Sequence, residues 1–343
     1  MKRRLVWTVL ATAAVTASAA TVDGAPSQPP RAPKVLVVTA STAEAQPWIA
    51  ALGLTQSVPV AGSYPKDPVV HCNADDVCLL TTGVGKANAA ASVAAAVFGG
   101  AFDLSHTYFL VASLAAIDPA KGTLGSIAWA SRVVDGAIAW EVDARSLPSG
   151  WTTGYLGIDA TSPTDVPLGL FGTETYTLSP TLAGKAAGLS KVASLADDGG
   201  AKTCRAGYAS GPATAAPSVV QCDALTTDTA WQGALLGAHA TAWMALVTGT
   251  QDTYCARQAQ DNAVMAALSR GASAGLVDST RIAVVHGASS FDRPPAGQSA
   301  FEAVTSCGAA GVPSATGNLA QAGKAVVDAI VSDWTHWQGG VPQ

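Results

Sequence analysis

A short apolar run near the end of the chain stops abruptly at small and polar residues, and this pattern constrains the fold most. Residues 282–285 read Ile-Ala-Val-Val, which is typical of a strand buried on both faces. The polar residues that follow at once are His286, Ser289, Ser290 and Asp292. Ligands of open α/β sheets sit beyond the carboxyl ends of the strands, so a ligand site is expected here.

Predicted strands and helices alternate along the first hundred mature residues. Strands are predicted at 34–39, 77–82, 107–112 and 281–286, with a hairpin of 127–134 and 138–144 that turns at Asp135 and Gly136. Helices are predicted at 43–52, ended by Gly53, and at 86–98, 182–197, 230–248, 258–270 and 318–334; long loops are expected at 148–180. This alternation predicts an α/β layer structure. No internal repeat or linker divides residues 34–343, so we expect one domain there.

The N-terminus has the pattern of a secretory signal peptide over residues 1–25. Basic residues at positions 2–4 precede an apolar, Ala-rich segment, and small residues at 17–19 suit a signal peptidase. No Cys lies near this cleavage zone, which argues against a lipoprotein anchor. Residues 26–33 are Pro-rich and are expected to form an unstructured lead-in. The mature protein is therefore expected to be secreted or periplasmic.

Hydropathy and charge argue against two classes of protein. The apolar run 108–117 is far below the ~20 residues of a spanning helix, and Gln232 and His239 interrupt the longer run 231–247, so no integral membrane span is predicted. Charged residues make up 13% of the chain, and the formal net charge is -5. An acidic chain without a basic stripe argues against binding to nucleic acid.

All six cysteines follow the predicted signal peptide, which suggests up to three disulfides in an exported protein. Fifteen pairings are possible. Cys72 and Cys78 flank a predicted turn and are the first choice, Cys222 with Cys255 is a weaker assignment, and Cys204 with Cys307 is the remainder. A zinc site is the alternative, but no Cys-x-x-Cys or His-x-x-x-His spacing supports it. No metal or cofactor is therefore expected.

Several segments match one protein family, in order and at consistent spacing. They are Thr81-Thr82-Gly83-Val84-Gly85-Lys86-Ala87-Asn88-Ala89-Ala90, Asp118-Pro119-Ala120-Lys121-Gly122-Thr123-Leu124-Gly125-Ser126, Glu141-Val142-Asp143-Ala144-Arg145, Pro217-Ser218-Val219-Val220-Gln221-Cys222-Asp223, Asp261-Asn262-Ala263 and Phe291-Asp292-Arg293-Pro294. On these segments the chain resembles the purine nucleoside permease family over roughly residues 33–332. The resemblance implies a nucleoside phosphorylase-like fold, a three-layer α/β/α structure with a twisted mixed central sheet. That fold is often oligomeric, so a homo-oligomer is an open expectation.

The resemblance also implies a chemistry, the cleavage of the N-glycosidic bond of purine nucleosides. The departing base needs a proton or hydrogen bond at its imidazole nitrogen, and the sugar needs phosphate, or water with a general base. In this fold the general acid is the Asp of a Ser-Asp pair after the last strand. This chain has Ser290 at that position, and His286 where the family has Arg. A serine donates a hydrogen bond but supplies no proton at neutral pH.

Residues after the first two predicted strands are candidates for water and ribose contacts. Glu44 stands where nucleosidases of this fold place a water-orienting Glu; the alternative is a solvated acid in the first helical turn. Gly83 and Gly85 open a helix and suit backbone contacts to an anion or ribose, unless they serve only a tight turn. No Arg lies in this loop to hold phosphate, which favours water as the acceptor.

Two further segments carry candidate substrate-binding residues. Ser113 and Ala115 lie at a strand end where the family has Ala-Gly-Ile-Ala-Gly; two glycines are replaced here, which reshapes the pocket or reflects drift in the core. Gln260, Asp261 and Asn262 resemble the family's Glu-Asp-Asn, which implies that Asp261 holds the ribose hydroxyls. The alternative for these three residues is an exposed helix turn.

The remaining candidates are two polar residues near position 290 and several aromatic side chains. His286 is either a hydrogen-bonded core residue or a replacement acid, because imidazole titrates in the right range. Asp292 is either a substitute acid or a structural partner of Arg293. The candidates for stacking on a purine, equally explained as core residues, are Tyr155, Phe171, Tyr176 and Trp231.

The sequence therefore predicts an exported nucleoside-handling protein, most simply a purine nucleosidase-like hydrolase. In this hypothesis Glu44 positions water, Asp261 the ribose, and Ser290 with Asp292 the base. The rival is a nucleoside- or nucleobase-binding, uptake-assisting protein that has kept the pocket and lost the chemistry, because departures from the family pattern cluster where its site should lie. A hydrolase of another glycoside and a ligand-free storage or structural role remain further alternatives.

Overall fold

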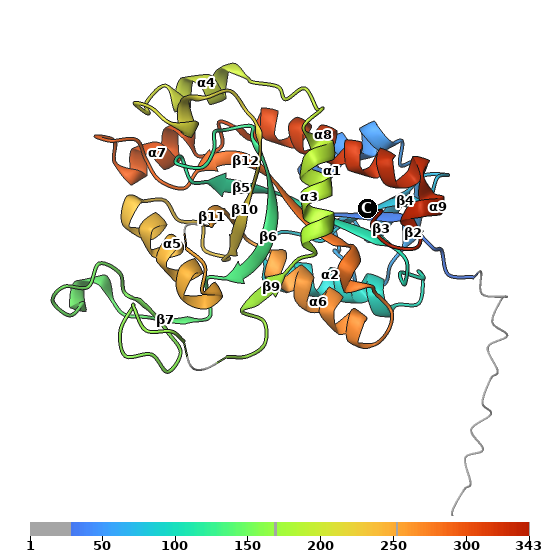
Figure 1. The fold of residues 1–343 in the computed structure, drawn as a ribbon, viewed down its shortest axis with the longest axis horizontal. Helices are drawn as coiled ribbons and strands as arrows, with labels where there is room; N and C mark the ends of the chain where they lie inside the picture. The colour runs from blue at the N-terminus through green and yellow to red at the C-terminus, as the bar shows by residue number, and fades with distance from the viewer. Residues whose placement is uncertain (1–28, 168–169, 252, 343) are drawn as a thin grey trace, which may run out of the picture.

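The computed structural model describes residues 29–167, 170–251 and 253–342 of the 343-residue chain. The predicted signal peptide, residues 1–25, lies outside the described residues. A ten-stranded mixed sheet forms the centre of the fold, and a two-stranded sheet lies at its edge (Figure 1). The strands are β1 (Val35–Thr39), β2 (Gln56–Pro59), β3 (Val69–Cys72), β4 (Val77–Thr81), β5 (Tyr108–Ile117), β6 (Ile127–Asp135), β7 (Ala139–Glu141), β8 (Tyr155–Gly157), β9 (Thr175–Thr177), β10 (Val219–Thr226), β11 (Tyr254–Gln258) and β12 (Ile282–Phe291).

Helices cover both faces of the central sheet, which gives the predicted three layers (Figure 1). The helices α1, α3 and α8 pack on one face, and α2 and α6 pack on the other. The helices are α1 (Thr42–Leu52), α2 (Lys86–Phe98), α3 (Pro180–Ser190), α4 (Gly199–Arg205), α5 (Ala234–Thr248), α6 (Asp261–Ser273), α7 (Ala300–Cys307), α8 (Val312–Ser332) and α9 (Trp334–Trp337). The predicted nucleoside phosphorylase-like layer structure is thus confirmed.

The strand order makes part of the sheet close on itself. From one end the order is β11-β10-β6-β12-β5-β1-β4-β3-β2, and β9 pairs with β6. Strands β1, β4, β5 and β12 run parallel, β6 runs antiparallel to β12, and β10 and β11 run parallel to β6. Strand β11 also pairs antiparallel with the end of β5. The strands β5, β12, β6, β10 and β11 therefore form a ring beside the open part of the sheet.

The central strands are apolar because both of their faces are covered. All five residues of β1 and of β4 are buried. Parallel strands between two helical layers read as continuous apolar runs rather than as alternating ones. This explains why the sequence identified these strands correctly.

Helix boundaries in this part of the chain follow local sequence signals. The Oγ of Ser41 caps α1 by accepting a hydrogen bond from the backbone N of Glu44 at 3.3 Å. Gly53 ends α1 with a φ of 62°, in the left-handed region that favours glycine. The predicted helix at 43–52 and its end at Gly53 are therefore confirmed.

Three disulfides are present, and they use the pairs that the sequence ranked. Cys72–Cys78 joins ladder partners of β3 and β4, and Cys222–Cys255 joins β10 to β11. Cys204–Cys307 joins α4 to α7 across 103 residues of chain. No free cysteine remains among the described residues.

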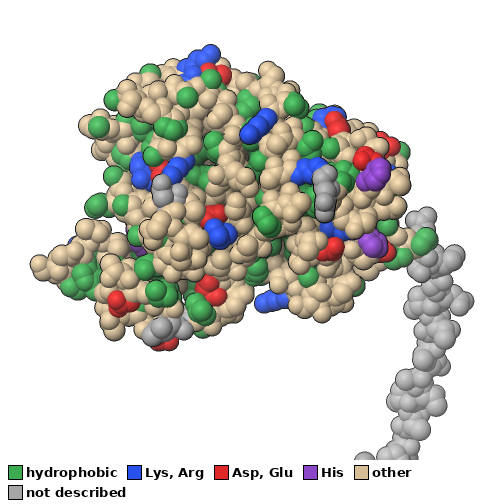
Figure 2. All heavy atoms as spheres, viewed as in Figure 1, with side chains coloured by type: hydrophobic (Ala, Val, Ile, Leu, Met, Phe, Trp, Pro, Cys, Tyr) green, Lys and Arg blue, Asp and Glu red, His purple; other side chains and the backbone are tan. Residues whose placement is uncertain are grey.

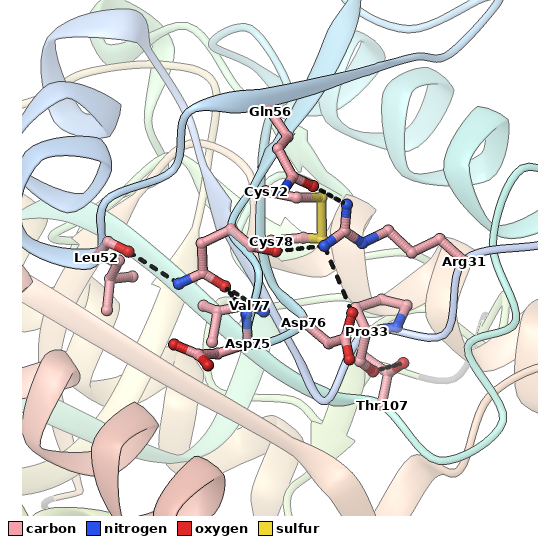
Figure 3. The surroundings of a disulfide bond; sticks show 11 residues. Arg31, Pro33, Leu52, Gln56, Cys72, Asp75, Asp76, Val77, Cys78 and Thr107 are labelled. Atoms are coloured by element: carbon pink, nitrogen blue, oxygen red, sulfur yellow. Dashed lines mark hydrogen bonds and ion pairs between the residues drawn. A yellow bond between two sulfur atoms is a disulfide. The ribbon is translucent and has the colours of Figure 1, made fainter.

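The last residues of the Pro-rich lead-in are ordered, in contrast to the prediction. Arg31 bridges to Phe102 in a parallel backbone pairing. Its guanidinium reaches the hairpin of the Cys72–Cys78 disulfide, where it donates to Gln56 Oε1 at 2.6 Å and to the backbone oxygen of Asn73 (Figure 3). Unstructured chain was predicted from composition alone, which cannot register these contacts.

Several other predicted elements are corrected. The hairpin across Asp135 and Gly136 is wrong, because β7 pairs with β8 while β6 pairs with β9, β10 and β12. Strands β5 and β12 extend beyond the predicted 107–112 and 281–286, since their ends pair in the ring. Helix α3 ends at Ser190 rather than at 197, and α5 begins at Ala234 rather than at 230. Gln258 belongs to β11, so α6 begins at Asp261.

Charged side chains of both signs are interspersed on the face shown in Figure 2, without a broad basic area. Among the helices of the described residues, none combines the length and the apolar character that crossing a bilayer requires.

Candidate functional site

The expected site region lies around four parallel strands and the segments that follow them. Glu44 follows β1 and Gly83 follows β4, while Ser113 and His286 lie within the longer strands β5 and β12. The ladder pairs Ser113 with His286, Ala115 with Ala288, and Ala116 with Ser290. Residues from distant parts of the sequence are thereby brought to neighbouring positions.

Glu44 is buried, with only 6% of its surface exposed. Its Oε1 accepts a hydrogen bond from the backbone N of Leu114 at 2.8 Å, and its Oε2 accepts one from Ser41 Oγ at 3.1 Å. Burial raises the pKa of the Glu44 carboxyl, although these hydrogen bonds oppose the rise. The alternative of a solvated helix residue is therefore wrong. A carboxylate whose pKa is raised is a stronger proton acceptor, which suits general-base work.

The turn between β4 and α2 requires its two glycines. Gly83 has a φ of 82° and Gly85 a φ of 94°, which L side chains rarely adopt. A Cβ at Gly83 would lie 2.6 Å from Cδ2 of Tyr64, so the tyrosine ring packs directly on this turn. Both glycines are thus required by the turn itself, which also sets the start of α2.

The N-terminus of α2 already holds a carboxylate of the same chain. Asp228 Oδ1 accepts a hydrogen bond from the backbone N of Lys86 at 2.9 Å. Lys86 Nζ forms an ion pair with Asp135 at 3.1 Å. A helix N-terminus is a natural position for an anion, and Asp228 occupies this one. Asp228 was not among the predicted site residues, because the strand β10 that precedes it was not predicted.

His286 and Asp261 form a buried polar pair. His286 Nε2 lies 2.7 Å from Asp261 Oδ2, and the two residues are 1% and 0% exposed. Their other polar atoms, His286 Nδ1 and Asp261 Oδ1, have no hydrogen-bond partner within the described part of the chain. His286 is thus a hydrogen-bonded core residue, and one ring nitrogen remains free for another partner. The exposed helix turn suggested for 260–262 is wrong, since all three residues are buried.

Further buried side-chain atoms lack a hydrogen-bond partner, and together with those of the pair we call them the buried polar cluster. It consists of Ser113 Oγ, Gln260 Oε1 and Nε2, Asp261 Oδ1, Asn262 Oδ1 and His286 Nδ1, none of them hydrogen-bonded within the described residues. Burying a polar atom without a partner typically costs about 1–3 kcal/mol, so native proteins rarely concentrate such atoms. All five residues were predicted to bind substrate. A polar ligand or ordered water would satisfy these atoms.

Asp292 is held by its neighbours. Arg293 Nε donates to Oδ1 at 2.7 Å, and the Tyr254 hydroxyl donates to Oδ2 at 2.9 Å. Arg293 also forms an ion pair with Asp118 at 2.9 Å. Burial raises the pKa of Asp292, while Arg293 lowers it. The structural interpretation of Asp292 is therefore the one that the contacts favour.

The two serines after the predicted strand have different surroundings. Ser289 Oγ donates a hydrogen bond to the backbone oxygen of Ala115 at 3.2 Å. Ser290 lies at a register shift in β12, beside Ala116 of β5, and is partly exposed. Ser290 is thus free of the network that holds Asp292.

Two of the four aromatic candidates line one cavity of about 140 Å³. Tyr155 stacks on His239 at a ring-centroid distance of 5.0 Å. Trp231 lines the same cavity. Burial lowers the pKa of His239 to about 4, so its ring is neutral near pH 7. Phe171, by contrast, is 65% exposed, and Tyr176 packs against the core under α2 and α6.

A chain of hydrogen bonds through β10 and β11 links one cavity-lining residue to the segment that carries Gln260 and Asp261. Thr227 lines the cavity, and its backbone N donates to the backbone oxygen of Gln258 at 2.8 Å. Gln258 Oε1 in turn accepts hydrogen bonds from the backbone N of Gln260 at 2.6 Å and of Asp261 at 2.9 Å. An aromatic-walled cavity and a polar cluster thus stand at adjoining strand ends.

Arg257 is a second residue that the sequence analysis missed. It lies on β11, and its Nη2 donates to the backbone oxygen of Trp231 at 3.2 Å. Strand β11 was not predicted, because its short sequence mixes apolar residues with Arg257 and Gln258. The pattern of apolar and polar residues over 254–258 was the only sequence signal for this strand.

Relatives and solved structures place this chain in a known group. It is 31% identical over 308 residues to a purine nucleoside permease of Candida albicans, covering 88% of this chain and 76% of that protein. It is 31% identical over 319 residues to a probable purine nucleoside permease of Schizosaccharomyces pombe, covering 89% and 91%.

Solved structures of low sequence identity share the fold. The 5′-methylthioadenosine/S-adenosyl homocysteine nucleosidase of Helicobacter pylori matches with a TM-score of 0.52 and 11% identity, covering 88% of this chain and 100% of that one. The futalosine hydrolase of Helicobacter pylori matches with a TM-score of 0.51 and 12% identity, covering 87% and 98%. The model of the purine nucleoside permease family matches residues 32–342. The chain therefore belongs to the purine nucleoside permease family and has the fold of the nucleosidases.

Proposed function

We propose that this protein is an exported purine nucleosidase-like hydrolase, which cleaves the N-glycosidic bond with water as the acceptor. The observation that carries the proposal is the buried polar cluster, whose five residues lie on β5, on β12 and at the start of α6 and carry unpartnered atoms. Ribose hydroxyls both donate and accept hydrogen bonds, so a nucleoside sugar matches this mixture of donors and acceptors. The relatives are named purine nucleoside permeases, and a solved structure of the same fold is a nucleosidase, which supports the substrate class.

In this proposal Glu44 activates the attacking water. The carboxylate takes a proton from water as the water oxygen bonds to C1′ of the ribose, and the bond from C1′ to N9 of the purine breaks. The base leaves with the bonding electron pair and is protonated from solvent. The raised pKa of Glu44 favours proton acceptance near neutral pH. Asp261, held by His286, would bind the ribose hydroxyls through its free Oδ1.

Water is preferred over phosphate as the acceptor because of Asp228. Its carboxylate occupies the N-terminus of α2, where a phosphate would otherwise find backbone N–H donors. A second anion there would meet the charge of Asp228 at close range. The Gly83-Val84-Gly85 turn also carries no arginine.

A second candidate function is nucleoside binding without cleavage, as an uptake-assisting protein would need. Ser290 cannot supply a proton, and Asp292 is engaged by Arg293 and Tyr254. Loss of a general acid typically costs ~10²–10⁴ in rate. This candidate keeps the same pocket and differs only in the absence of turnover.

We also propose that the protein is exported and that it forms a homo-oligomer. Three disulfides support an oxidising compartment, in agreement with the predicted signal peptide. A homo-oligomer and a single domain over residues 34–343 are expected from the resemblance and from the lack of a linker.

Product analysis of the mature, oxidised protein tests the proposal. Adenosine, inosine and guanosine are incubated with and without phosphate, and the products are separated by chromatography. We expect free base and free ribose at the same rate in both buffers. Ribose 1-phosphate would contradict the assignment of water as the acceptor. Absence of any free base, with nucleoside binding retained by calorimetry, would replace hydrolysis by the binding function.

A further inference from the structure

Arg257 lies at the level of the sheet where the base-recognising residue is expected. The ladder pairs Ala116 of β5 with Ser290 of β12 on one side and with Arg257 of β11 on the other. Neighbouring strands lie ~4.8 Å apart. The backbones of Ser290 and Arg257, which lie on either side of β5, are therefore about 10 Å apart across the sheet.

The Arg257 guanidinium is a desolvated cation without an ion-pair partner. It is partly buried, and it forms no salt bridge with any carboxylate of the described residues. The nearby carboxylate of Asp292 is bound to Arg293 and Tyr254 instead. The single hydrogen bond of Arg257 within the described chain goes to the backbone oxygen of Trp231, and its buried Nε has no partner. The hydrogen-bonding capacity of the guanidinium is therefore only partly used within the described chain.

An aromatic surface holds the guanidinium in place. It stacks over the Trp231 ring, with Cζ 5.2 Å from the ring centroid. Trp231 lines the cavity that Tyr155 and His239 also line. Stacking on an aromatic face and a hydrogen bond to backbone restrict the guanidinium to one orientation, which favours recognition of a flat acceptor edge.

We propose that Arg257 recognises the O6 and N7 edge of a 6-oxopurine, so that the protein selects hypoxanthine or guanine nucleosides over adenine nucleosides. This inference rests on the proposed nucleoside-binding function and adds its base specificity. Arginine carries five donors and no acceptor, and it pairs bidentately with the O6 and N7 acceptors. Adenine offers an acceptor at N7 but a donor at N6. The N6 donor would face an N–H donor of Arg257, and two donors cannot form a hydrogen bond.

Ser290 strengthens the same preference. An aspartate at this position would accept a hydrogen bond from the exocyclic amine of adenine, whereas a serine hydroxyl also donates. Ser290 replaces that carboxylate, and Arg257 lies on the other side of β5. The edge of the base would therefore meet hydrogen-bond donors where the carboxylate offered acceptors. The cation also stabilises the negative charge that develops on a departing base.

Calorimetric titration with free bases tests this inference without requiring catalysis. Hypoxanthine and adenine have nearly the same shape and differ at position 6. The wild-type protein is expected to bind hypoxanthine about 5- to 150-fold more tightly than adenine, the usual value of one bidentate contact. Arg257→Gln is expected to reverse the preference, because glutamine pairs with N6 and N7 of adenine. Arg257→Lys should lower the preference, since an ammonium cannot form the bidentate pair.

The possible outcomes distinguish a failure of the base preference assigned to Arg257 from a failure of nucleoside binding. Equal or tighter binding of adenine by the wild-type protein would overturn the role of Arg257 while leaving nucleoside binding intact. An unchanged preference in a folded Arg257→Gln or Arg257→Lys protein would overturn it as well. If neither base nor inosine binds the wild-type protein, the proposed function falls together with the specificity. Arg270→Gln, the same change at an exposed residue of α6, is the matched control and should leave both affinities unchanged.

Discussion

Buried polar side chains around the strand ends oppose stability, and their retention is best explained by function. Glu44 is desolvated, and the buried polar cluster leaves atoms of Ser113, Gln260 and Asp261 without partners in the described chain. Each such group costs free energy of folding unless a ligand or water satisfies it. Substitutions that remove these groups should therefore separate stability from activity.

Glu44→Gln is predicted to stabilise the protein at neutral pH and to abolish most hydrolysis. The folded-state pKa of Glu44 is raised, so the folded protein holds a proton that the unfolded chain releases above about pH 4.3. The carboxyl therefore favours folding in acid, and this contribution is lost as pH rises through the folded pKa. Thermal unfolding from pH 4 to 8 should show a variant advantage at pH 7 that vanishes in acid. Turnover should fall by ~10²–10⁴.

Glu302→Gln provides the control for this titration. Glu302 is exposed and completes the capping box of α7, and hydrogen bonds from Ser299 lower its pKa. Its contribution is therefore present above the unfolded pKa and lost as pH falls. The Glu302 variant should be less stable at pH 7, and an increase in its melting temperature would undermine the interpretation of Glu44.

Ser290→Asp is predicted to raise the rate of base release, because it restores a carboxylic acid where the family places its general acid. The gain expected from a working acid is ~10²–10⁴ in kcat. Ser289→Asp puts the same group on the adjacent residue, whose Oγ bonds to the backbone oxygen of Ala115. Single-turnover measurements should show acceleration only for the change at 290. An equal effect of both variants, or none, would argue that position 290 does not face the base.

The elements that build the site are those with the strongest local signals. Strand β1, helix α1 and the β4–α2 turn were predicted from apolar runs, from Gly53 and from the two glycines, and the first two of these elements position Glu44. Strands β10 and β11 were missed because residues such as Asp223 and Arg257 break the apolar pattern. Their pairing depends on the closed ring, which no local pattern encodes. Asp228 and Arg257 were missed for the same reason.

The glycine turn before α2 gives a prediction at the scale of an element. Gly83→Ala should destabilise the protein by more than Gly100→Ala, although both glycines have positive φ, 82° and 74°. The added methyl group at 83 meets the Tyr64 ring, whereas a Cβ at 100 meets nothing within 4 Å. The backbone strain of about 1–2 kcal/mol is shared, so the difference between the variants measures the crowding at Tyr64. Equal melting temperatures would show that the turn adapts freely.

The whole molecule is a three-layer structure in which the ring of strands brings separate segments together. The layers were predicted from the alternation of strands and helices and from the family resemblance. The meeting of His286 with Asp261 and of Ser113 with His286 depends on strand register, which the sequence pattern does not determine. The family motif therefore supplied the candidate residues, and only the fold defines their contacts. The same ring carries Arg257 to the level of Ser290.

Comparing the binding of inosine with that of 2′,3′-dideoxyinosine shows whether the buried polar cluster holds the ribose hydroxyls. Calorimetry on the oxidised wild-type protein needs no variant and no turnover. Removing both hydroxyls should weaken binding about tenfold or more, since the cluster would again be left unpartnered. Equal affinity for the two nucleosides would contradict the account, because the cluster would then have no part in binding the sugar.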